Sequence, residues 1–425
     1  MKILWLCNIM LPKIAKGLSL PVRSINGWLT GMSEELIKQE KISFAVSFPV
    51  SDQAKPLEGN VDGVEYYAFP WIKKEFAYSQ STEDYLFSVL KKTVPDVIHI
   101  FGTEFPHTLA MVRACERAAL VNRVVIHIQG LTSVYAQHFF AALPEKVIHS
   151  YSFRDIIKRD NIFHAYRKYQ KRGLFETEAL QKVSHVFGRT DWDRTCTEII
   201  HPDIIYHTCN ETLRRTFYEH AWSLQNCERH SIFVSQWDYP IKGFHLLLKA
   251  LPDLLRRYPD LMVYTTGKNP CEKKGIKNRL KQNYYLIYIR KLIEAYDLKK
   301  HIVFLGKELD EQSMCSAFLR AHVFLSPSSI ENSPNSLGEA MLLGVPCVSS
   351  DVGGVKNMLE HGAEGFIYPY EEFYMITHYI SRIFDNDTLA LQFSVAARKH
   401  AKKTHNPEKN LKDLMQAYKE ICSTS

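Results

Sequence analysis

The chain of 425 residues alternates short apolar runs with longer amphipathic stretches, and this alternation occurs twice. Runs of three to six apolar residues predict buried strands. Stretches with helical spacing, such as Trp28–Gln39 and Phe244–Tyr258, lie between them. Such strands separated by helices are typical of parallel βαβ units. The predicted strands are Ile3–Cys7, Ile42–Ser47, Val97–Ile100, Val124–Ile128, Val183–Phe187, Ser231–Val234, Met262–Thr266, Ile302–Phe304, Val323–Leu325 and Pro346–Ser349.

Strand signals lapse near residues 205–230, where polar residues collect. We therefore expect two doubly wound α/β domains, one at 1–210 and the other at 211–399. Ligands of such sheets bind beyond the carboxyl ends of the strands, and two facing sheets would leave a cleft between them. The candidates are the residues just after the strands: His127, Arg189, Gln236 to Lys242, Gly267, Gly306, and Ser326 to Glu331.

Composition narrows the class of protein. The net charge of +7 and the apolar fraction of 46% exclude a disordered chain and give no reason to expect nucleic-acid binding. The small positive charge suits a partner that is an acidic small molecule or an anionic membrane surface. The nine cysteines stand singly, without a C-x-x-C pair, which argues against a zinc knuckle and indicates a reducing cytoplasm.

The apolar start of the chain resembles a signal peptide only superficially. Asn8 interrupts it, and Lys13 and Lys16 follow at once, so we interpret it as a buried strand. No apolar run approaches the length of a membrane span. Any membrane contact is therefore expected to be peripheral, at the inner face of the membrane.

The segment Glu331-Asn-Ser-Pro-Asn-Ser-Leu-Gly-Glu339 carries the strongest chemical signal. Ser333 is the expected N-cap and Pro334 the first helical residue. The free backbone N–H groups at the helix start would bind a diphosphate, assisted by the helix dipole. They belong to Asn335, Ser336 and Leu337. The two carboxylates suit vicinal sugar hydroxyls. The alternative is a plain surface helix with solvated glutamates.

Here the chain resembles retaining glycosyltransferases of family 4. Glu331 and Glu339 match the E-x7-E motif of that family. The basic phosphate loop is matched by Tyr239-Pro240-Ile241-Lys242-Gly243. The remaining matches are Leu343 to Val348, Asp351 to Gly354, Pro95 to His99, the strand ending in His127, and Asn26-Gly27-Trp28. The resemblance covers most of the chain, and it rests on the order and spacing of these pieces together.

The resemblance implies a GT-B fold, with two Rossmann-like domains facing across a cleft. The first would hold the acceptor, with Gly27 and Trp28 on the acceptor side, and the C-terminal helix, about 400–425, would pack back on it. By resemblance, Glu331 contacts the donor hexose and Glu339 the ribose. Lys242 contacts the diphosphate, and His127 lies near the donor sugar.

Two positions depart from the family pattern. Gln236 stands where the family usually has an arginine, so one cation for the leaving diphosphate is missing. Arg189 and Lys307 are the nearest candidates to replace it. Asn26 replaces the first glycine of the N-terminal turn, a mild change because asparagine tolerates positive φ.

Asp191 and Asp193 invite a different interpretation. They form a D-x-D pair like the metal site of GT-A transferases. Asp191 could equally cap the helix that follows. A GT-B enzyme needs no metal, because the helix dipole and Lys242 supply the positive field.

Residues 153–172 combine seven basic residues with Phe153, Phe163, Tyr166 and Tyr169. A solvated helix pair is the simpler interpretation. The alternative is a surface that meets anionic lipid or a lipid diphosphate acceptor.

Together these features predict a retaining, metal-independent hexosyltransferase that acts by front-face attack. The donor would be a nucleoside-diphosphate sugar, with a UDP-sugar favoured over a GDP-sugar and no further cofactor. The acceptor would be a glycan or lipid-linked saccharide in bacterial surface polysaccharide synthesis. A non-catalytic binding partner of another transferase is the alternative that Gln236 motivates. A GT-B sugar-nucleotide epimerase is a third.

Overall fold

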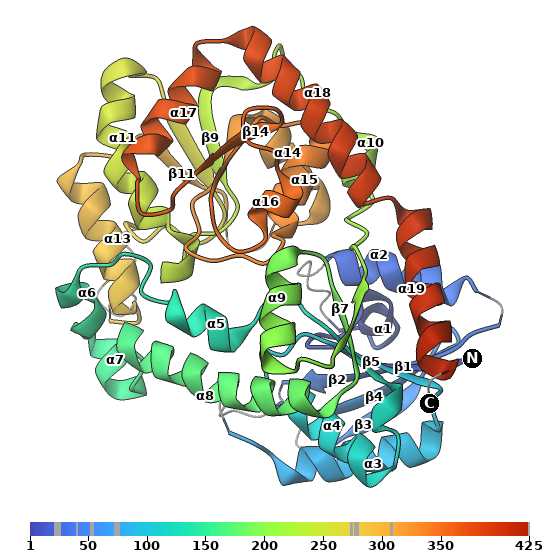
Figure 1. Ribbon diagram of the computed structural model, residues 1–425. Helices are drawn as coiled ribbons and strands as arrows, with labels where there is room; N and C mark the ends of the chain where they lie inside the picture. Colours follow the sequence, from blue (N-terminus) through green and yellow to red (C-terminus); the bar gives the residue numbers. More distant parts are fainter. Residues whose placement is uncertain are drawn as a thin grey trace. The chain divides into compact units, whose positions relative to one another are not determined.

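A computed structural model describes residues 1–20, 27–39, 41–51, 55–71, 77–272, 275, 280–306 and 309–423. The chain forms two compact units (Figure 1). Unit 1 consists of Met1–Ala136, Lys168–Thr212 and His405–Ser425. Unit 2 consists of Gln137–Arg167 and Leu213–Thr404. The predicted α/β class with two doubly wound sheets is confirmed, and among the described strands all pairs but one are parallel.

Unit 1 is built on a sheet in the order β3-β4-β2-β1-β5-β6-β7-β8. Every neighbouring pair is parallel except β3 and β4. Strands β3, β4 and β8 were not predicted, because β3 and β8 are largely exposed and Glu65 interrupts the apolar pattern of β4. The strands are β1 (Lys2–Leu6), β2 (Ser43–Val50), β3 (Leu57–Val61), β4 (Val64–Pro70), β5 (Val97–Phe101), β6 (Val124–His127), β7 (His185–Gly188) and β8 (Ile205–Thr208).

Helices cover both faces of this sheet, and each face has its own hydrophobic core. They are α1 (Pro12–Gly17), α2 (Gly27–Ile37), α3 (Gln80–Thr93), α4 (His107–Arg117), α9 (Asp191–Ile200) and α19 (Pro407–Ser423). The last of them, red in Figure 1, contacts α2 and β5. The buried Tyr418 hydroxyl accepts a hydrogen bond from Trp5 Nε1 (3.0 Å) and lies 2.7 Å from His99 Nδ1. The end of the chain is thus part of the core of unit 1.

Unit 2 is built on a fully parallel sheet in the order β11-β10-β9-β12-β13-β14. Its strands are β9 (Glu228–Val234), β10 (Met262–Thr265), β11 (Ile302–Phe304), β12 (Ala321–Ser326), β13 (Cys347–Ser350) and β14 (Gly365–Tyr368). Its helices are α6 (Glu145–His149), α7 (Phe153–Lys158), α10 (Thr216–Glu219), α11 (Phe244–Arg257), α13 (Tyr284–Ala295), α14 (Glu311–Arg320), α15 (Asn335–Leu343), α16 (Val355–Met358), α17 (Tyr374–Phe384) and α18 (Asp387–Thr404).

Residues 137–167 belong to unit 2 although they come early in the chain. The buried His245 places Nε2 2.7 Å from the Ala141 carbonyl, and Ser329 Oγ donates to the His138 carbonyl (3.0 Å). The predicted boundary at residue 210 places residues 137–167 in the first domain instead. Two helices, α5 (Thr132–Gln137) and α8 (Ile162–Lys182), continue from one unit into the other.

Within the described part of the chain, none of the helices combines the length and the apolar character that crossing a bilayer requires.

Candidate functional site

In unit 2 the loops after two neighbouring strands, β9 and β12, contact each other at the carboxyl end of the sheet. Gly243 has φ +66°, and a Cβ there would lie 1.8 Å from the Pro327 carbonyl oxygen. Glycine is therefore required for this close approach. The Ser329 N–H donates to the Ile241 carbonyl (2.8 Å) and fixes the two loops together.

The loop after β13 holds the backbone of Glu331 from the other side. The Gly354 N–H donates to the Glu331 carbonyl (3.1 Å). Gly353 has φ +51°, and a Cβ there would lie 1.8 Å from the same oxygen. Three adjacent strands thus fix the position of Glu331, which the sequence singled out.

Lys242 and Glu331 form an ion pair in this corner of unit 2. Lys242 Nζ donates to Glu331 Oε1 at 2.6 Å, and Ser328 Oγ donates to the same oxygen at 2.7 Å. Burial lowers the pKa of Lys242, but the Glu331 carboxylate and the Tyr239 hydroxyl outweigh it, so the pKa lies above its usual value. The lysine is therefore a fixed cation at neutral pH.

Helix α15 starts one residue later than the sequence predicted. Pro334, with φ −66° and ψ 118°, is the N-cap in place of Ser333, and the first helical residue is Asn335. The Leu337 N–H donates to the Pro334 carbonyl (2.9 Å), so it is not one of the free groups, contrary to prediction. Among the described residues, the N–H groups of Asn335 and Ser336 have no partner. These two N–H groups form the positive end of the helix dipole.

Glu339, inside α15, is paired with Arg214, which no sequence motif predicted. Arg214 Nε and one terminal nitrogen donate to the two carboxylate oxygens, both at 2.7 Å. Burial raises the pKa of Glu339, and Arg214 opposes the rise. Arg214 lies outside any predicted strand or helix, 125 positions from its partner, so no local pattern points to it.

The loops after β10 and β11 meet at two glycines. The Gly267 N–H donates to the Gly306 carbonyl (2.6 Å), and both glycines have positive φ, +96° and +105°. A Cβ on Gly267 would lie 2.6 Å from Trp237 Nε1. Gln236, which precedes this buried tryptophan, is itself exposed. Lys307, predicted to replace the missing cation, lies outside the described residues.

The other predicted site residues belong to unit 1. His127 ends β6 and is fully buried, with its ring 5.4 Å from that of His99 and 5.7 Å from that of Phe187. Burial, then His99 and Arg189, hold the pKa of His127 well below its usual value, so the ring is neutral. Gly27 starts α2, whereas Asn26 and the side chain of Trp28 lie outside the described residues.

Arg189, the other proposed cation, has a buried partner within unit 1. One terminal nitrogen lies 2.6 Å from Glu211 Oε2, and the other donates to the Ile128 carbonyl (3.2 Å). Its charge is therefore compensated by a neighbouring carboxylate.

The D-x-D pair lies in the first turn of α9, and Asp193 takes part in capping that helix. Thr190, rather than Asp191, is the N-cap of α9, and Asp193 completes a capping box with it. The Asp193 carboxylate also accepts from the Arg189 N–H (3.0 Å) and the Tyr206 hydroxyl (2.6 Å). One of the two carboxylates of the D-x-D alternative is thus used within the fold.

The predicted basic segment 153–172 has its exposed apolar side chains on and next to α7. Tyr151, Phe153, Ile156 and Ile157 are exposed, and the last two are 64% and 66% accessible. Lys158 and Arg159 follow them and are exposed too. We call these six residues the α7 surface. In α8, by contrast, Tyr166 packs on Phe140, with 4.8 Å between the ring centroids.

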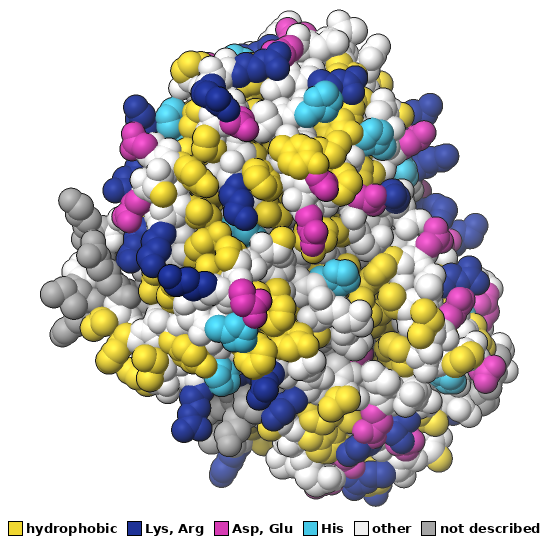
Figure 2. Space-filling model, turned by 60° about the vertical axis from the view of Figure 1, so that its left-hand side comes forward, with side chains coloured by type: hydrophobic (Ala, Val, Ile, Leu, Met, Phe, Trp, Pro, Cys, Tyr) yellow, Lys and Arg dark blue, Asp and Glu magenta, His cyan; other side chains and the backbone are white. Residues whose placement is uncertain are grey.

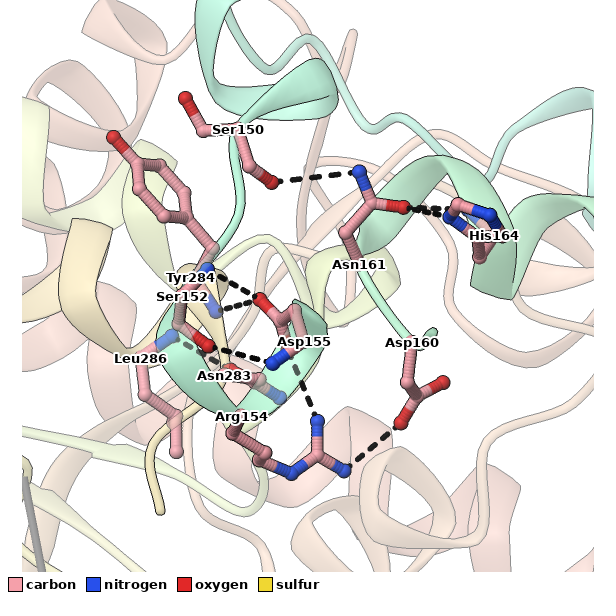
Figure 3. A network of polar contacts seen from close by, with 10 residues as sticks. All are labelled: Ser150, Ser152, Arg154, Asp155, Asp160, Asn161, His164, Asn283, Tyr284 and Leu286. Carbon is pink, nitrogen blue, oxygen red and sulfur yellow. Dashed lines mark hydrogen bonds and ion pairs between the residues drawn. The ribbon is translucent and has the colours of Figure 1, made fainter. Parts of the chain in front are cut away.

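A buried carboxylate anchors α7 to the rest of unit 2 (Figure 3). Asp155 accepts from the Ser152 N–H (3.0 Å) and from the Tyr284 N–H (2.9 Å) at the start of α13. It also accepts from Arg154 (3.1 Å), which donates to Asp160 as well (2.9 Å). The charge of Arg154 is therefore compensated inside the network, and Lys158 and Arg159 remain on the surface.

Among the comparisons with known proteins, the family match falls on unit 2. Residues 219–400 match the family model of glycosyl transferases group 1. The phosphatidyl-myo-inositol mannosyltransferase of Mycolicibacterium smegmatis is 30% identical over 145 residues, which is 34% of this chain and 33% of that protein. The chain thus spans about a third of the length of this curated relative, and 47% of the Mycobacterium leprae protein of the same name.

Solved structures are similar to this chain over its whole length, and two of them illustrate this. Sucrose-phosphate synthase from Thermosynechococcus elongatus has a TM-score of 0.74 at 15% identity and covers 100% of both chains. The Anabaena protein HepE in complex with UDP-glucose has a TM-score of 0.66 at 15% identity, again over 100% of both chains. The expected GT-B fold is confirmed by these likenesses.

Proposed function

From the match of residues 219–400 to glycosyl transferases group 1, we propose that the protein is a retaining, metal-independent glycosyltransferase. The donor is a nucleoside-diphosphate hexose bound at the carboxyl edge of the unit 2 sheet. The observation that carries the proposal is the Lys242–Glu331 ion pair, fixed by three loops next to the start of α15.

The chemistry follows from the charges at this edge. The donor diphosphate binds the N–H groups of Asn335 and Ser336 and competes with Glu331 for Lys242. Glu331, freed from the lysine, then accepts hydrogen bonds from the hexose hydroxyls. Glu339 uses two of about four acceptor positions for Arg214, so it can still bind the ribose.

The reaction is front-face substitution. The bond between the anomeric carbon and the diphosphate oxygen breaks, an oxocarbenium-like centre forms, and the acceptor hydroxyl attacks from the same face. The leaving phosphate oxygen takes the acceptor proton. The protein stabilises the charge that develops on the leaving group, and each well-placed donor contributes about 3 kcal/mol. In unit 1 we retain His127 and Arg189 as candidate donor-side residues and Gly27 and Trp28 as candidate acceptor-side residues.

UDP is the favoured nucleotide, and HepE, which shares the fold, is solved with UDP-glucose. The acceptor is a glycan or a lipid-diphosphate-linked saccharide. The curated mannosyltransferase is named for a lipid, phosphatidyl-myo-inositol, which supports a lipid-linked acceptor. We place the reaction in bacterial surface polysaccharide synthesis, in the cytoplasm at the inner face of the membrane.

A second candidate function rests on Gln236, an uncharged residue that follows β9 at the position where the family pattern usually has an arginine. A non-catalytic protein with this fold would bind a nucleotide sugar or glycan and support another transferase.

Isothermal titration of the full chain with UDP and with GDP, each with and without EDTA, tests the donor site. We expect UDP to bind more tightly than GDP and EDTA to have no effect, because the N–H groups and Lys242 supply the positive field. Loss of binding in EDTA would favour a metal-dependent enzyme. Binding of neither nucleotide would remove the donor assignment. Transfer or hydrolysis of a bound UDP-sugar separates the enzyme from the non-catalytic alternative.

We further propose that the α7 surface contacts an anionic membrane. Hydrophobic and basic side chains lie beside one another on the face in Figure 2. At α7, two isoleucines and two aromatic residues extend into solvent next to Lys158 and Arg159. This combination fits a headgroup layer, which accepts apolar side chains and attracts cations.

Vesicle sedimentation tests this contact. The chain is expected to bind vesicles of phosphatidylglycerol and phosphatidylcholine more strongly than vesicles of phosphatidylcholine alone. Ile156→Ser with Ile157→Ser should weaken binding roughly tenfold or more, because two apolar side chains no longer enter the bilayer. The matched control is Leu391→Ser with Val395→Ser, which removes exposed apolar side chains from α18. Equal loss in both double variants would contradict a specific membrane surface.

A further inference from the structure

A mixed polar and aromatic cluster lies at the carboxyl edge of the unit 1 sheet. The residues come from three strands: Asn8 follows β1, Trp71 follows β4, and Glu104 and Phe105 follow β5. All four are half-buried. Sheets of this kind bind ligands at this edge.

A chain of hydrogen bonds fixes the carboxylate in the cluster. The buried His107 places Nε2 2.7 Å from Asn8 Oδ1, and Asn8 Nδ2 donates to Glu104 Oε2 (3.2 Å). Burial lowers the pKa of His107 to about 3, so the ring is neutral and Nε2 acts as donor to the amide oxygen. The orientation of the Asn8 amide is therefore determined, with its N–H toward Glu104.

Gly102 allows the carboxylate to lie over the backbone. It has φ +82°, and a Cβ there would lie 2.0 Å from Glu104 Oε2 and 3.1 Å from Asn8 Nδ2. A side chain at this position would have a strained backbone and would push the Glu104 carboxyl group away from where it lies. The glycine thus leaves room for the carboxyl group beside Asn8.

Aromatic rings and a cation surround the pair. The rings of Trp71 and Phe105 meet edge to face, with 5.0 Å between their centroids, and the Phe105 ring stacks on His107 at 5.5 Å. The guanidinium of Arg172 lies 5.7 Å from the Phe105 centroid. Its buried Nε–H has no hydrogen-bond partner within the described residues.

We propose that this cluster binds a sugar ring of the acceptor. The inference rests on the proposed function and names the acceptor subsite. Glu104 and Asn8 hydrogen-bond vicinal hydroxyls: burial raises the pKa of Glu104 to about 7, so its carboxyl group can accept a hydrogen bond and, when protonated, donate one. Trp71 and Phe105 cover the C–H face of the ring, and Arg172 supplies a further donor.

Saturation-transfer NMR on the full chain in the presence of UDP tests the subsite. The probes are the methyl α-glycosides of glucose, mannose and N-acetylglucosamine. At least one is expected to receive saturation transfer at its ring protons. Glu104→Gln and Trp71→Ala should each weaken that probe's binding about tenfold, since a hydrogen bond to a carboxylate and an aromatic face are lost.

The matched control is Glu116→Gln at the opposite end of α4. Glu116 is exposed and pairs only with Lys182 (2.8 Å) among the described residues, so this change should leave the glycoside signal as it is. UDP titration of every variant keeps donor binding as a separate readout. Unchanged UDP binding with weaker glycoside binding supports the subsite.

Two results would overturn the inference: glycoside binding in Glu104→Gln and Trp71→Ala as strong as in the unchanged chain, or no signal from any of the three probes while UDP binds. A glycoside signal without UDP binding would instead contradict the proposed donor site and leave the subsite standing as a glycan-binding site. The two proposals can therefore fail separately.

Discussion

Lys242→Ala is expected to lower kcat by about a hundredfold or more. The substitution removes a fixed cation from the leaving diphosphate, and one such donor is worth about 3 kcal/mol in the transition state. Gln236 carries no charge that could replace it. The measurement is steady-state turnover of the UDP-sugar that binds in the titration.

The effect on chemistry must be separated from an effect on folding, because the variant leaves Glu331 without its cation. Thermal unfolding of Lys242→Ala, and of Lys242→Ala with Glu331→Gln, provides that separation. Lys356→Ala is the matched control, since Lys356 is an exposed lysine of unit 2 paired with Asp351 (2.7 Å). Near-normal turnover in a folded Lys242→Ala enzyme would remove Lys242 from the mechanism.

Arg214→Ala is expected to destabilise unit 2 by about 3–5 kcal/mol. Both partners of the Arg214–Glu339 pair are nearly buried. Removing the arginine therefore leaves the Glu339 carboxylate largely desolvated and without an opposite charge. For a domain of this size the loss corresponds to a melting temperature lower by roughly 6–20 °C. Differential scanning calorimetry, which resolves separate domain transitions, measures it.

The neighbouring Arg215 supplies the control. It is 91% exposed by side-chain accessibility and pairs with Glu219 one helical turn away, so Arg215→Ala should shift the transition by less than about 1 kcal/mol. Arg214→Met with Glu339→Gln should regain much of the stability, because no buried charge remains. If Arg214→Ala and Arg215→Ala melt alike, the pair has no structural role.

Much of the fold could be predicted from the sequence, since a buried parallel strand needs a short apolar run and the helices between strands need an apolar stripe. The predicted strands correspond to β1, β2, β5, β6 and β7 and to β9 to β13. The motif residues could be named as well. Lys242 and Glu331 each follow a strand, and β9 and β12 are neighbours, so both come to the same edge of the sheet.

The sequence could not determine which charges pair, to which unit residues 137–167 belong, or where α15 starts. The first two depend on contacts between residues far apart in the chain. Arg214 pairs with Glu339 across 125 positions, and residues 137–167 pack within unit 2 through His245 and Asp155. The start of α15 at Asn335 depends on backbone angles at Pro334.

The same holds for the proposed acceptor subsite. Asn8, Trp71 and Glu104 stand in three separate strand-ending loops, and only the strand order β4-β2-β1-β5 brings those loops to one edge. Local residue patterns thus determined the strands, the helices and the donor motif of this protein. The tertiary structure decided which charges are paired, because the pairing depends on burial and on which strands are neighbours.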